Sequence, residues 1–481
     1  MRLDKLRLKN FRCFGDFELL FNTSSRLTVL VAENGQGKST VLDAIRIGVW
    51  PFIKSFDLAK SSTFNDPSNS ISVDDARLIQ GHSSGTMVRL LPVEVELTGD
   101  WGTGTAKTWR RFREKEDRKT KTLDDENTKL MKQWAEAVQK QVQSESQNQR
   151  DLPVFGYYGT GRLWAQKHLR DADRLSKAEE ADLPIRTFGY RNCMDPASSY
   201  KHFREWFIWA WESRSNMRER QHVTDEERSN ADHRIKVIQE VVNIFLKETS
   251  GWHTLEYSVE DQKSIILHHD THCRMKVDDL SDGIRSMLAM VGDIAYRCIK
   301  LNPHLGRLAA KETCGVVLID EVDMHLHPRW QQLVLAQLTK AFPRIQFIVT
   351  THSPQVLTTV DNTCIRILRQ RDEAGEQTME VITPTLQTKG VASADVLAQI
   401  MLIDPVPNVP EAQALSRYRQ LIETDLMMDA QESNQLRESL LAHFGLSHPV
   451  MQECERLIRL QAIKKRLPPA QQHEKGHATD A

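Results

Sequence analysis

The residues best suited to chemistry form a glycine-containing loop, AENGQGKST, at positions 32–40. The loop follows RLTVLVA, a continuous apolar run typical of a strand buried on both faces, and leads into the helical pattern VLDAIRIGVW. Glycines let successive backbone N–H groups point at phosphate oxygens, and a helix N-terminus favours an anion. Lys38 would then reach the terminal phosphates, and the Ser39 hydroxyl would ligate Mg²⁺. The loop therefore predicts a nucleotide-phosphate site, although Ala32 stands where the pattern usually begins with glycine.

A second motif, of acidic residues, lies far downstream in VVLIDE at 316–321. Its apolar residues predict a buried strand that ends at Asp320 and Glu321. Such a strand can hold the aspartate beside the phosphate loop, where the carboxylate supports Mg²⁺ directly or through water. Glu321 could then polarise the attacking water as a general base. The alternative interpretation is a buried strand that ends in two solvated acids.

Two further strings carry groups that can meet a phosphate. LSDGIRS (280–286) begins a predicted helix, in which Ser281 is a good cap and Gly283 permits close backbone approach. IVTTHSP (348–354) ends a buried strand at His352, which can hydrogen-bond a γ-phosphate. Taken alone, the first string is common by chance and the second is explained by a capping or core histidine. Their order relative to the other two motifs makes them informative.

This order of strings resembles that of an ABC-type ATPase head of the RecF/SMC/Rad50 group, and LRLKNFRCF near the start is similar to the group's first strand and turn. The resemblance implies an α/β fold with a mixed sheet lobe and a helical lobe, and ATP and Mg²⁺ as cofactors. It also implies a homodimer or higher homo-oligomer through the heads, with ATP between the phosphate loop of one head and the Ser281–Gly283 turn of the other. MHLHP (324–328) would then lie in the dimer contact.

The same resemblance assigns roles to individual residues. Lys38, Glu321 and His352 would act in catalysis. Ser39, Asp320 and Gln80 would ligate Mg²⁺. Gln80, in DDARLIQG, is the candidate for the group's metal-ligating glutamine, and the alternative is an ordinary loop glutamine. The nucleotide would contact Asn10, Arg12, Asn34, Gly35, Gln36, Gly37, Lys38, Ser39, Thr40, Ser281 and Gly283.

The sequence around the motifs predicts an ATPase head with a helical insertion and a helical C-terminal extension. Strand and helix patterns alternate through 1–164, charged helices dominate 165–250, and sheet patterns return in 251–390. Residues 391–466 have helical patterns throughout and are the candidate region for partner or oligomer contacts. The polar tail 467–481 is expected to be disordered.

Three groups of side chains outside the motifs have open roles. The basic run WRRFREKEDRKTK (109–121) is either a solvated face or a track for nucleic-acid phosphates. A turn that either packs on the head or stacks on a base carries Tyr157, Tyr158, Arg162 and Trp164. A helically spaced stripe indicates core or dimer surface and comprises Phe203, Trp206, Phe207, Trp209 and Ala210.

Three longer strings, at 152–164, 188–207 and 390–407, resemble the ATPase of Septu-type antiphage systems, which is also found beside certain retrons. This resemblance implies an ATP-hydrolysing sensor and regulator that dimerises through its heads and controls a separately encoded HNH endonuclease. The alternative is a RecF-like, ATP-dependent DNA-binding factor in repair, without a nuclease partner. A protein that cuts nucleic acid by itself ranks below both, because no acidic or histidine-based nuclease motif stands out.

Composition limits the remaining classes. The 481 residues include 64 Lys and Arg against 65 Asp and Glu, which excludes a globally basic nucleic-acid binder and leaves only a local patch for such contact. No apolar run approaches the roughly 20 residues of a membrane helix, and the first residues lack the apolar core of a secretion signal. The 7 cysteines are dispersed, which argues against a disulfide framework. We therefore expect a cytoplasmic protein with no membrane partner.

Overall fold

The computed structural model describes most of the chain, in two compact units, Met1–Met401 and Leu402–Ala481. The described residues are 1–59, 67–81, 85–144, 150–161, 184–196, 199–220, 222–271, 274–373, 376–424 and 430–466. The division differs from the boundary expected at residue 390, because α13 (Ser393–Gln399) packs against α12 (Pro354–Leu357) of the first unit. The tail for which disorder is predicted lies outside the described residues, as do Arg162 and Trp164.

A six-stranded sheet of described residues forms the centre of the first unit. Its order is β16 (Glu376–Ile382), β15 (Ile365–Glu373), β3 (Leu27–Val31), β14 (Ile345–Thr350), β13 (Gly315–Ile319) and β9 (Val154–Tyr158). β15, β3, β14, β13 and β9 run parallel, and β16 pairs antiparallel with β15. Every residue of β3, β9, β13 and β14 is buried, as continuous apolar runs predict for strands covered on both faces.

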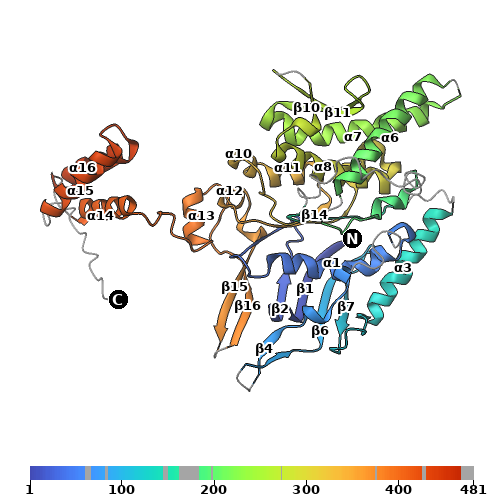
Figure 1. Cartoon of the computed structure of the whole chain (residues 1–481), viewed down its shortest axis with the longest axis horizontal. Coiled ribbons are helices and arrows are strands. Elements are labelled where there is room, and N and C mark those ends of the chain that lie inside the picture. The colour runs from blue at the N-terminus through green and yellow to red at the C-terminus, as the bar shows by residue number, and fades with distance from the viewer. Residues whose placement is uncertain are drawn as a thin grey trace, which may run out of the picture. The chain divides into compact units, whose positions relative to one another are not determined.

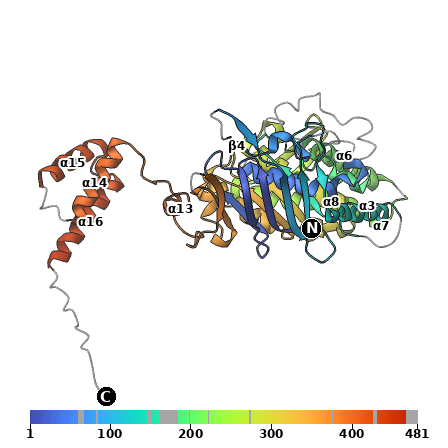
Figure 2. The same ribbon diagram turned by 90° about the horizontal axis from the view of Figure 1, so that it is seen from below.

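A second, antiparallel sheet covers the helix that follows the phosphate loop. Its order is β2 (Phe14–Leu20), β1 (Arg2–Phe11), β6 (Val93–Asp100), β7 (Lys107–Arg113) and β8 (Leu123–Asp124). Helix α1 (Lys38–Lys54) lies between this sheet and β14, and α3 (Glu126–Gln143) packs beside it (Figure 1). The Trp109 indole N–H donates to the Gly48 carbonyl over 2.8 Å, which ties β7 to α1. Figure 2 looks onto this sheet from outside.

A helical lobe covers the other face of the central sheet (Figure 1). It contains α6 (Ser199–Glu219), α7 (Asp225–Ser250) and α8 (Asp282–Leu301), which pack on one another. A small sheet beside it contains β10 (Trp252–Ser258), β11 (Ser264–His269) and β12 (Met275–Lys276). The described part of the predicted insertion belongs to the main hydrophobic core. The aromatic stripe belongs to that core, since Phe203, Trp206, Phe207 and Ala210 are buried.

Shorter elements complete the first unit. They are η1 (Pro67–Asn69), η2 (Val73–Asp75), β4 (Leu78–Gln80), β5 (Met87–Arg89), η3 (Arg186–Tyr190), η4 (Val277–Asp279), η5 (Pro303–Leu308), α9 (Ala309–Glu312), α10 (Pro328–Gln331), α11 (Val334–Ala341) and η6 (Asn362–Cys364). The mixed α/β fold class with a sheet lobe and a helical lobe is confirmed.

The second unit is helical and has its own small core. It contains α14 (Pro410–Thr424), α15 (Ala430–Phe444) and α16 (Pro449–Arg466). The core residues are Tyr418, Ile422, Leu440, Met451 and Cys454. Helix is confirmed as the main structure of the C-terminal region, although the segment between α13 and α14 is not helical. Across the described residues of both units, no helix combines the length and apolarity that spanning a membrane requires.

Candidate active site

The phosphate loop joins β3 to α1, as its sequence predicts. Gly35 and Gly37 adopt positive φ values of 81° and 86°, which favour glycine. A Cβ atom on Gly37 would lie 2.6 Å from Cζ of Phe14, so the loop also needs glycine there for space. Gly37 precedes the first residue of α1 and has no side chain to cap it. The first N–H groups of α1 therefore stay available for an anion.

Lys38 lies inside this loop. Its ammonium donates to the carbonyls of Ala32, over 2.9 Å, and Glu33, over 3.0 Å. Burial lowers the pKa of Lys38, and the nearby carboxylates of Asp320 and Glu321 oppose that shift. The cation is thus held between the loop and the two acids, close to the position that a bound phosphate would need.

The acidic motif meets the loop at the carboxyl edge of the central sheet. The Ser39 hydroxyl donates to Oδ2 of Asp320 over 2.7 Å, which joins residues 281 positions apart in sequence. The Thr350 hydroxyl donates to the other oxygen, Oδ1, over 2.6 Å. The backbone N–H of Glu321 donates to the same hydroxyl of Thr350 over 2.7 Å. Thr350 therefore connects both predicted acids.

Thr350 is a residue that the sequence interpretation missed. It is the last residue of β14, it is fully buried, and His352 stands two positions after it. The signal was present in TTH, because Thr350 ends a strand in which only Gln346 is otherwise polar, and two more polar residues follow it. Glu321 has a left-handed backbone with φ of 47°, so its hydrogen bond to Thr350 fixes the direction in which the chain leaves β13. The sheet edge thus brings together Lys38, Ser39, Asp320 and Glu321.

The predicted residues at the end of β1 have partners within the protein. The Arg12 guanidinium donates to Asp43 over 2.7 Å and to Asp75 over 2.8 Å. Asn10 donates its side-chain N–H to the Pro92 carbonyl over 3.0 Å. Asp43 lies on α1, so Arg12 is tied to the helix that begins in the phosphate loop. Nucleotide contact by Asn10 and Arg12 stays a prediction, and the sequence interpretation missed the two aspartates.

The turn before α8 packs on the segment that follows Glu321. Ser281 is the residue before the first turn of α8 and is exposed. A Cβ atom on Gly283 would lie 2.7 Å from the carbonyl oxygen of His325, so this contact requires glycine. The turn is therefore positioned by the segment 322–325, which directly follows the two acids. Its contact with the nucleotide of a second head stays a prediction.

Other predicted residues occupy more exposed places. Asn34 and Gly35 are exposed, whereas Gln36, Thr40 and His352 are partly buried. Gln80, expected in a loop, lies on β4 and pairs with Met87 of β5. No hydrogen bond among the described residues joins Gln80 to Ser39 or Asp320, and its role as a metal ligand stays a prediction.

Much of the basic run 109–121 serves the fold. Arg111 is buried, pairs with Asp124 over 2.9 Å and donates to two backbone carbonyls that include Ile47. Arg113 is also buried and donates to backbone carbonyls, among them that of Thr120. These two arginines cannot form part of a track for nucleic-acid phosphates. Tyr157 and Tyr158 are buried as well, which supports packing on the head over stacking on a base.

Comparisons with known proteins agree with this geometry. A family model described as an AAA domain matches residues 5–250, slightly more than half of the chain, and a second AAA domain model matches residues 174–358. The probable ATPase of retron Vc95 from Vibrio cholerae serotype O1 biovar El Tor is 27% identical over 478 residues, which cover 92% of this chain and 88% of that protein. Septu protein PtuA from Bacillus mycoides (strain KBAB4) is 39% identical over 98 residues, which cover 20% of this chain and 13% of PtuA.

A solved structure, the crystal structure of the SmcHead bound to the C-winged helix domain of ScpA, aligns with a TM-score of 0.47 and 15% identity, covering 80% of this chain and 98% of that chain. Family membership rests on the AAA domain match, and the relatives of similar length are themselves probable ATPases. The chain therefore belongs to the AAA domain family and is an ATPase, similar to the probable ATPase of retron Vc95 over most of its length and to Septu protein PtuA over 98 residues.

Proposed function

We propose that this ATPase is the sensor and regulator subunit of an antiphage defence complex, that it dimerises through its heads, and that it controls a separately encoded HNH nuclease. The observation that carries the proposal is the contact of Ser39 with Asp320 beside Lys38, because it assembles a hydrolytic site from two distant motifs. The similarity to the retron and Septu proteins supports the defence setting.

The residues at the sheet edge fit a magnesium ion. A serine hydroxyl and a carboxylate within 2.7 Å of each other are the oxygen donors that Mg²⁺ prefers. Ser39 and Asp320 would hold the ion, which supplies positive charge against the phosphates. Gln80 would be a further ligand only if β4 approached the loop.

Hydrolysis then depends on the protein's own groups. Lys38 exchanges the carbonyls of Ala32 and Glu33 for phosphate oxygens and neutralises their charge. Glu321 accepts a proton from the attacking water, and its backbone bond to Thr350 holds it in position. His352, at the end of the same edge, donates a hydrogen bond to the departing phosphate.

The ATPase site is tested first, by turnover and assembly of the purified full chain. We expect Lys38→Ala to abolish ATP binding. Glu321→Gln should bind ATP without hydrolysing it and should accumulate as a dimer in analytical ultracentrifugation, because the nucleotide persists between the heads. Ser281→Arg is the matched variant that should bind ATP and stay monomeric, since Ser281 is exposed at the start of α8. Normal turnover by Glu321→Gln would exclude it as the base.

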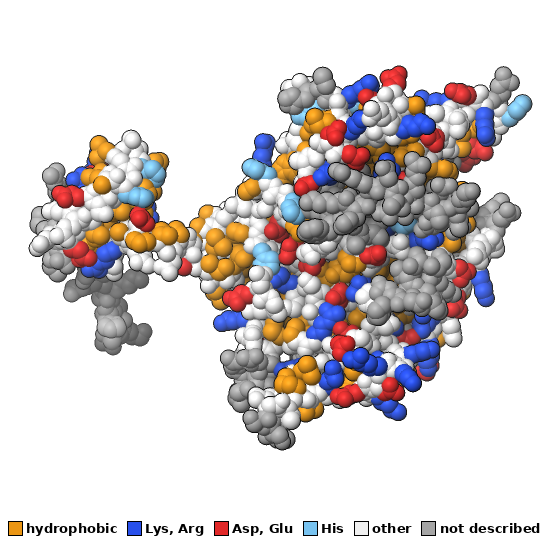
Figure 3. Space-filling model, viewed as in Figure 1, with side chains coloured by type: hydrophobic (Ala, Val, Ile, Leu, Met, Phe, Trp, Pro, Cys, Tyr) orange, Lys and Arg blue, Asp and Glu red, His pale blue; other side chains and the backbone are white. Residues whose placement is uncertain are grey.

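The regulatory role is tested with the neighbouring gene. If that gene encodes an HNH protein, co-expression should yield a complex and protect cells from phage in plaque assays, and Lys38→Ala should lose protection. The second unit is the proposed docking region, because it exposes Leu446, between α15 and α16, and Leu460 and Ile463 on α16. Figure 3 shows hydrophobic side chains at the surface of this unit. Leu460→Asp with Ile463→Asp should release the nuclease without changing ATP turnover. Full protection by Lys38→Ala would refute control by this ATPase.

A RecF-like role in DNA binding is less well supported. It relied on the basic run, in which Arg111 and Arg113 are buried and Arg110 pairs with Glu94 over 3.0 Å. Charge reversal at Lys119 and Lys121, which remain exposed, should leave affinity for duplex DNA unchanged in a mobility-shift assay. A large loss of affinity would favour the repair alternative.

A further inference from the structure

A polar cavity of about 300 Å³ lies between the first half of α7, the end of α8 and η5. None of the phosphate-loop residues lines it. Its polar lining consists of Arg186, Glu226, Asn230, His233, Arg234 and His304. Two arginines and two histidines thus face one exposed carboxylate among the described lining residues.

Neither arginine of the cavity forms an ion pair with a carboxylate among the described residues. Arg234 makes no ion pair with a described carboxylate, and its guanidinium stacks on Trp209 at 5.6 Å from the ring centroid. Arg186 donates to neutral acceptors, namely the carbonyls of Arg150 and Leu301 and, over 3.1 Å, the side chain of Asn302. These bonds hold the Arg186 guanidinium at the wall of the cavity, and the carboxylate of Asp151, which lies 2.7 Å from Nε2 of His304, offsets only part of its charge.

A third basic side chain, that of Lys300, lies beside the cavity. The Lys300 ammonium lies 5.9 Å from the centroid of the same Trp209 ring, so lysine and Arg234 share one aromatic neighbour. Burial, followed by repulsion from Arg234, lowers the pKa of Lys300 to about 7. Positive charge is therefore already unfavourable beside the cavity, and a bound anion would relieve it.

The histidines add polar atoms with unmet hydrogen-bonding capacity. Nε2 of His233 lies 3.4 Å from the Ser229 hydroxyl, whereas its buried Nδ1 has no hydrogen-bond partner among the described residues. Nε2 of His304 lies 2.7 Å from Asp151, and its buried Nδ1 likewise has no described partner. Because buried polar atoms are normally paired, these two nitrogens point to a ligand in the cavity.

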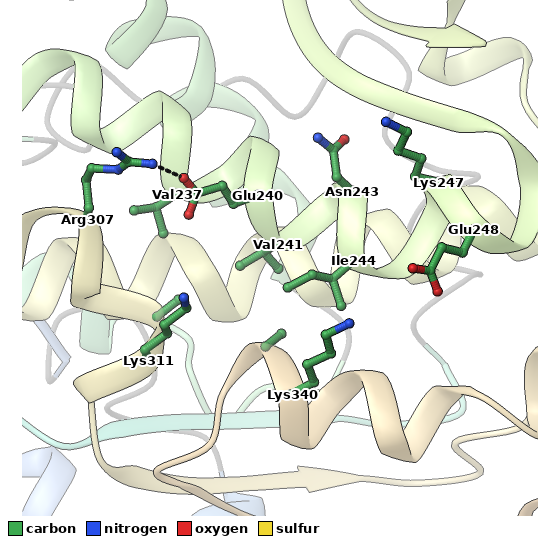
Figure 4. A pocket seen from close by; sticks show the side chains of 12 residues that line it. Val237, Glu240, Val241, Asn243, Ile244, Lys247, Glu248, Arg307, Lys311 and Lys340 are labelled. Atoms are coloured by element: carbon green, nitrogen blue, oxygen red, sulfur yellow. Dashed lines mark hydrogen bonds and ion pairs between the residues drawn. The ribbon is translucent and has the colours of Figure 1, made fainter. Parts of the chain in front are cut away.

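A neighbouring cavity differs from this one in the surroundings of its charged residues. It has a volume of about 390 Å³ and lies along the second half of α7, against α9 and α11. There Arg307 is neutralised by Glu240 over 2.5 Å, and Val237, Val241 and Ile244 form an apolar wall (Figure 4). Its other cations, Lys247, Lys311 and Lys340, are exposed to solvent, whereas Arg234 is partly buried against Trp209.

We propose that the cavity at Arg234 binds a small phosphorylated molecule, whose phosphate is held by Arg186, Arg234 and His233. A guanidinium fork matches phosphate geometry, and both arginines come from different elements, so they can approach one phosphate from two sides. The volume accommodates a phosphate with a sugar and excludes a nucleic-acid duplex. This site is independent of the ATPase site and does not rest on the proposed partner.

The test is calorimetric titration of the full chain with inorganic phosphate and ribose 5-phosphate. We expect saturable binding of at least one of them to the wild type and equally to Lys38→Ala, and no binding of unphosphorylated ribose. Arg234→Gln should weaken binding roughly tenfold or more, since a charge-assisted hydrogen bond is lost. Arg307→Gln is the matched control, an arginine on the neighbouring cavity that should leave affinity within about twofold.

Three results with the two small probes would overturn the proposal. They are absence of binding by both probes, unchanged affinity in Arg234→Gln, and loss of binding in Lys38→Ala, which would assign the phosphate to the ATPase site. A 5′-phosphorylated oligonucleotide is a further arm, and binding of that strand without either small probe would also overturn the proposal. If Arg234→Gln does not fold, His233→Phe replaces it: phosphate should raise the melting temperature of the wild type and not of this variant.

Discussion

Thr350→Val isolates the residue that joins the two acids of the ATPase site. Valine has nearly the same shape as threonine, so the substitution removes the hydroxyl and keeps the packing of a fully buried position. Two hydrogen bonds disappear together. Oδ1 of Asp320 loses its donor at 2.6 Å, and the N–H of Glu321 loses its acceptor at 2.7 Å.

The magnitude follows from the kinds of bond. A buried hydrogen bond to a carboxylate contributes about 1.5–3 kcal/mol, and a neutral one about 0.5–1.5 kcal/mol. We expect Thr350→Val to lower the unfolding free energy of the first unit by about 2–4 kcal/mol. Glu321, which has a left-handed backbone, also loses one of the bonds that hold its segment beside β14, whereas the bond from the Val322 N–H to the Thr350 carbonyl, over 3.0 Å, remains. Its carboxylate should therefore be less well oriented, and kcat should fall by roughly tenfold or more with little change in ATP affinity.

The assay combines urea unfolding with steady-state ATP hydrolysis. Thr28→Val is the matched control, because Thr28 is equally buried on β3 and accepts one backbone bond, from Asn22 over 3.0 Å, away from the acids. It should lower stability by about 1 kcal/mol and leave kcat unchanged. Equal kcat values for Thr350→Val and the wild type would refute the argument that this hydroxyl positions the acids.

Three further predictions concern single positions. Gly37→Ala should abolish ATP binding and lower the melting temperature, since its Cβ would lie 2.6 Å from Phe14 at a φ of 86°; nucleotide affinity like that of the wild type would contradict this. The unfolding free energy of the wild type should rise from pH 7 to pH 9. In this range folded Lys300, with its pKa of about 7, loses its proton, whereas Lys300 of the unfolded chain stays protonated, so a higher pH favours the folded state. Lys300→Met should flatten that rise in urea titrations at the two pH values, and an unchanged slope would exclude Lys300 as its source. Asp293→Ala should lower the unfolding free energy by about 3–5 kcal/mol, because it leaves the buried Arg297 without its counter-ion. In the wild type these two side chains lie 2.7 Å apart. A loss below about 1 kcal/mol in urea unfolding would show that Arg297 finds another partner.

Local sequence determined the parts of the site that depend on neighbouring residues. The apolar run before the loop, the glycines within it and the helix from Lys38 all depend on interactions over a few residues, and their order predicted the ATPase class. The same holds for the strand that ends at Asp320, since every residue of β13 is buried. The helices of the C-terminal region were predicted equally well, because amphipathic spacing is a local property of the sequence.

Only the tertiary structure decided which distant residues meet. Parallel pairing of β13, β14 and β3 brings Asp320, Thr350 and Ser39 to one edge, and no local pattern specifies that register. Burial of Arg111 likewise depends on Asp124, which a charge count along the chain cannot anticipate. The cavity at Arg234 arises where α7, α8 and η5 meet, which the pattern of none of these elements specifies. Contacts of this kind depend on packing of the whole chain. The sequence therefore predicted the residues that do the chemistry, but not the residues that hold them in position.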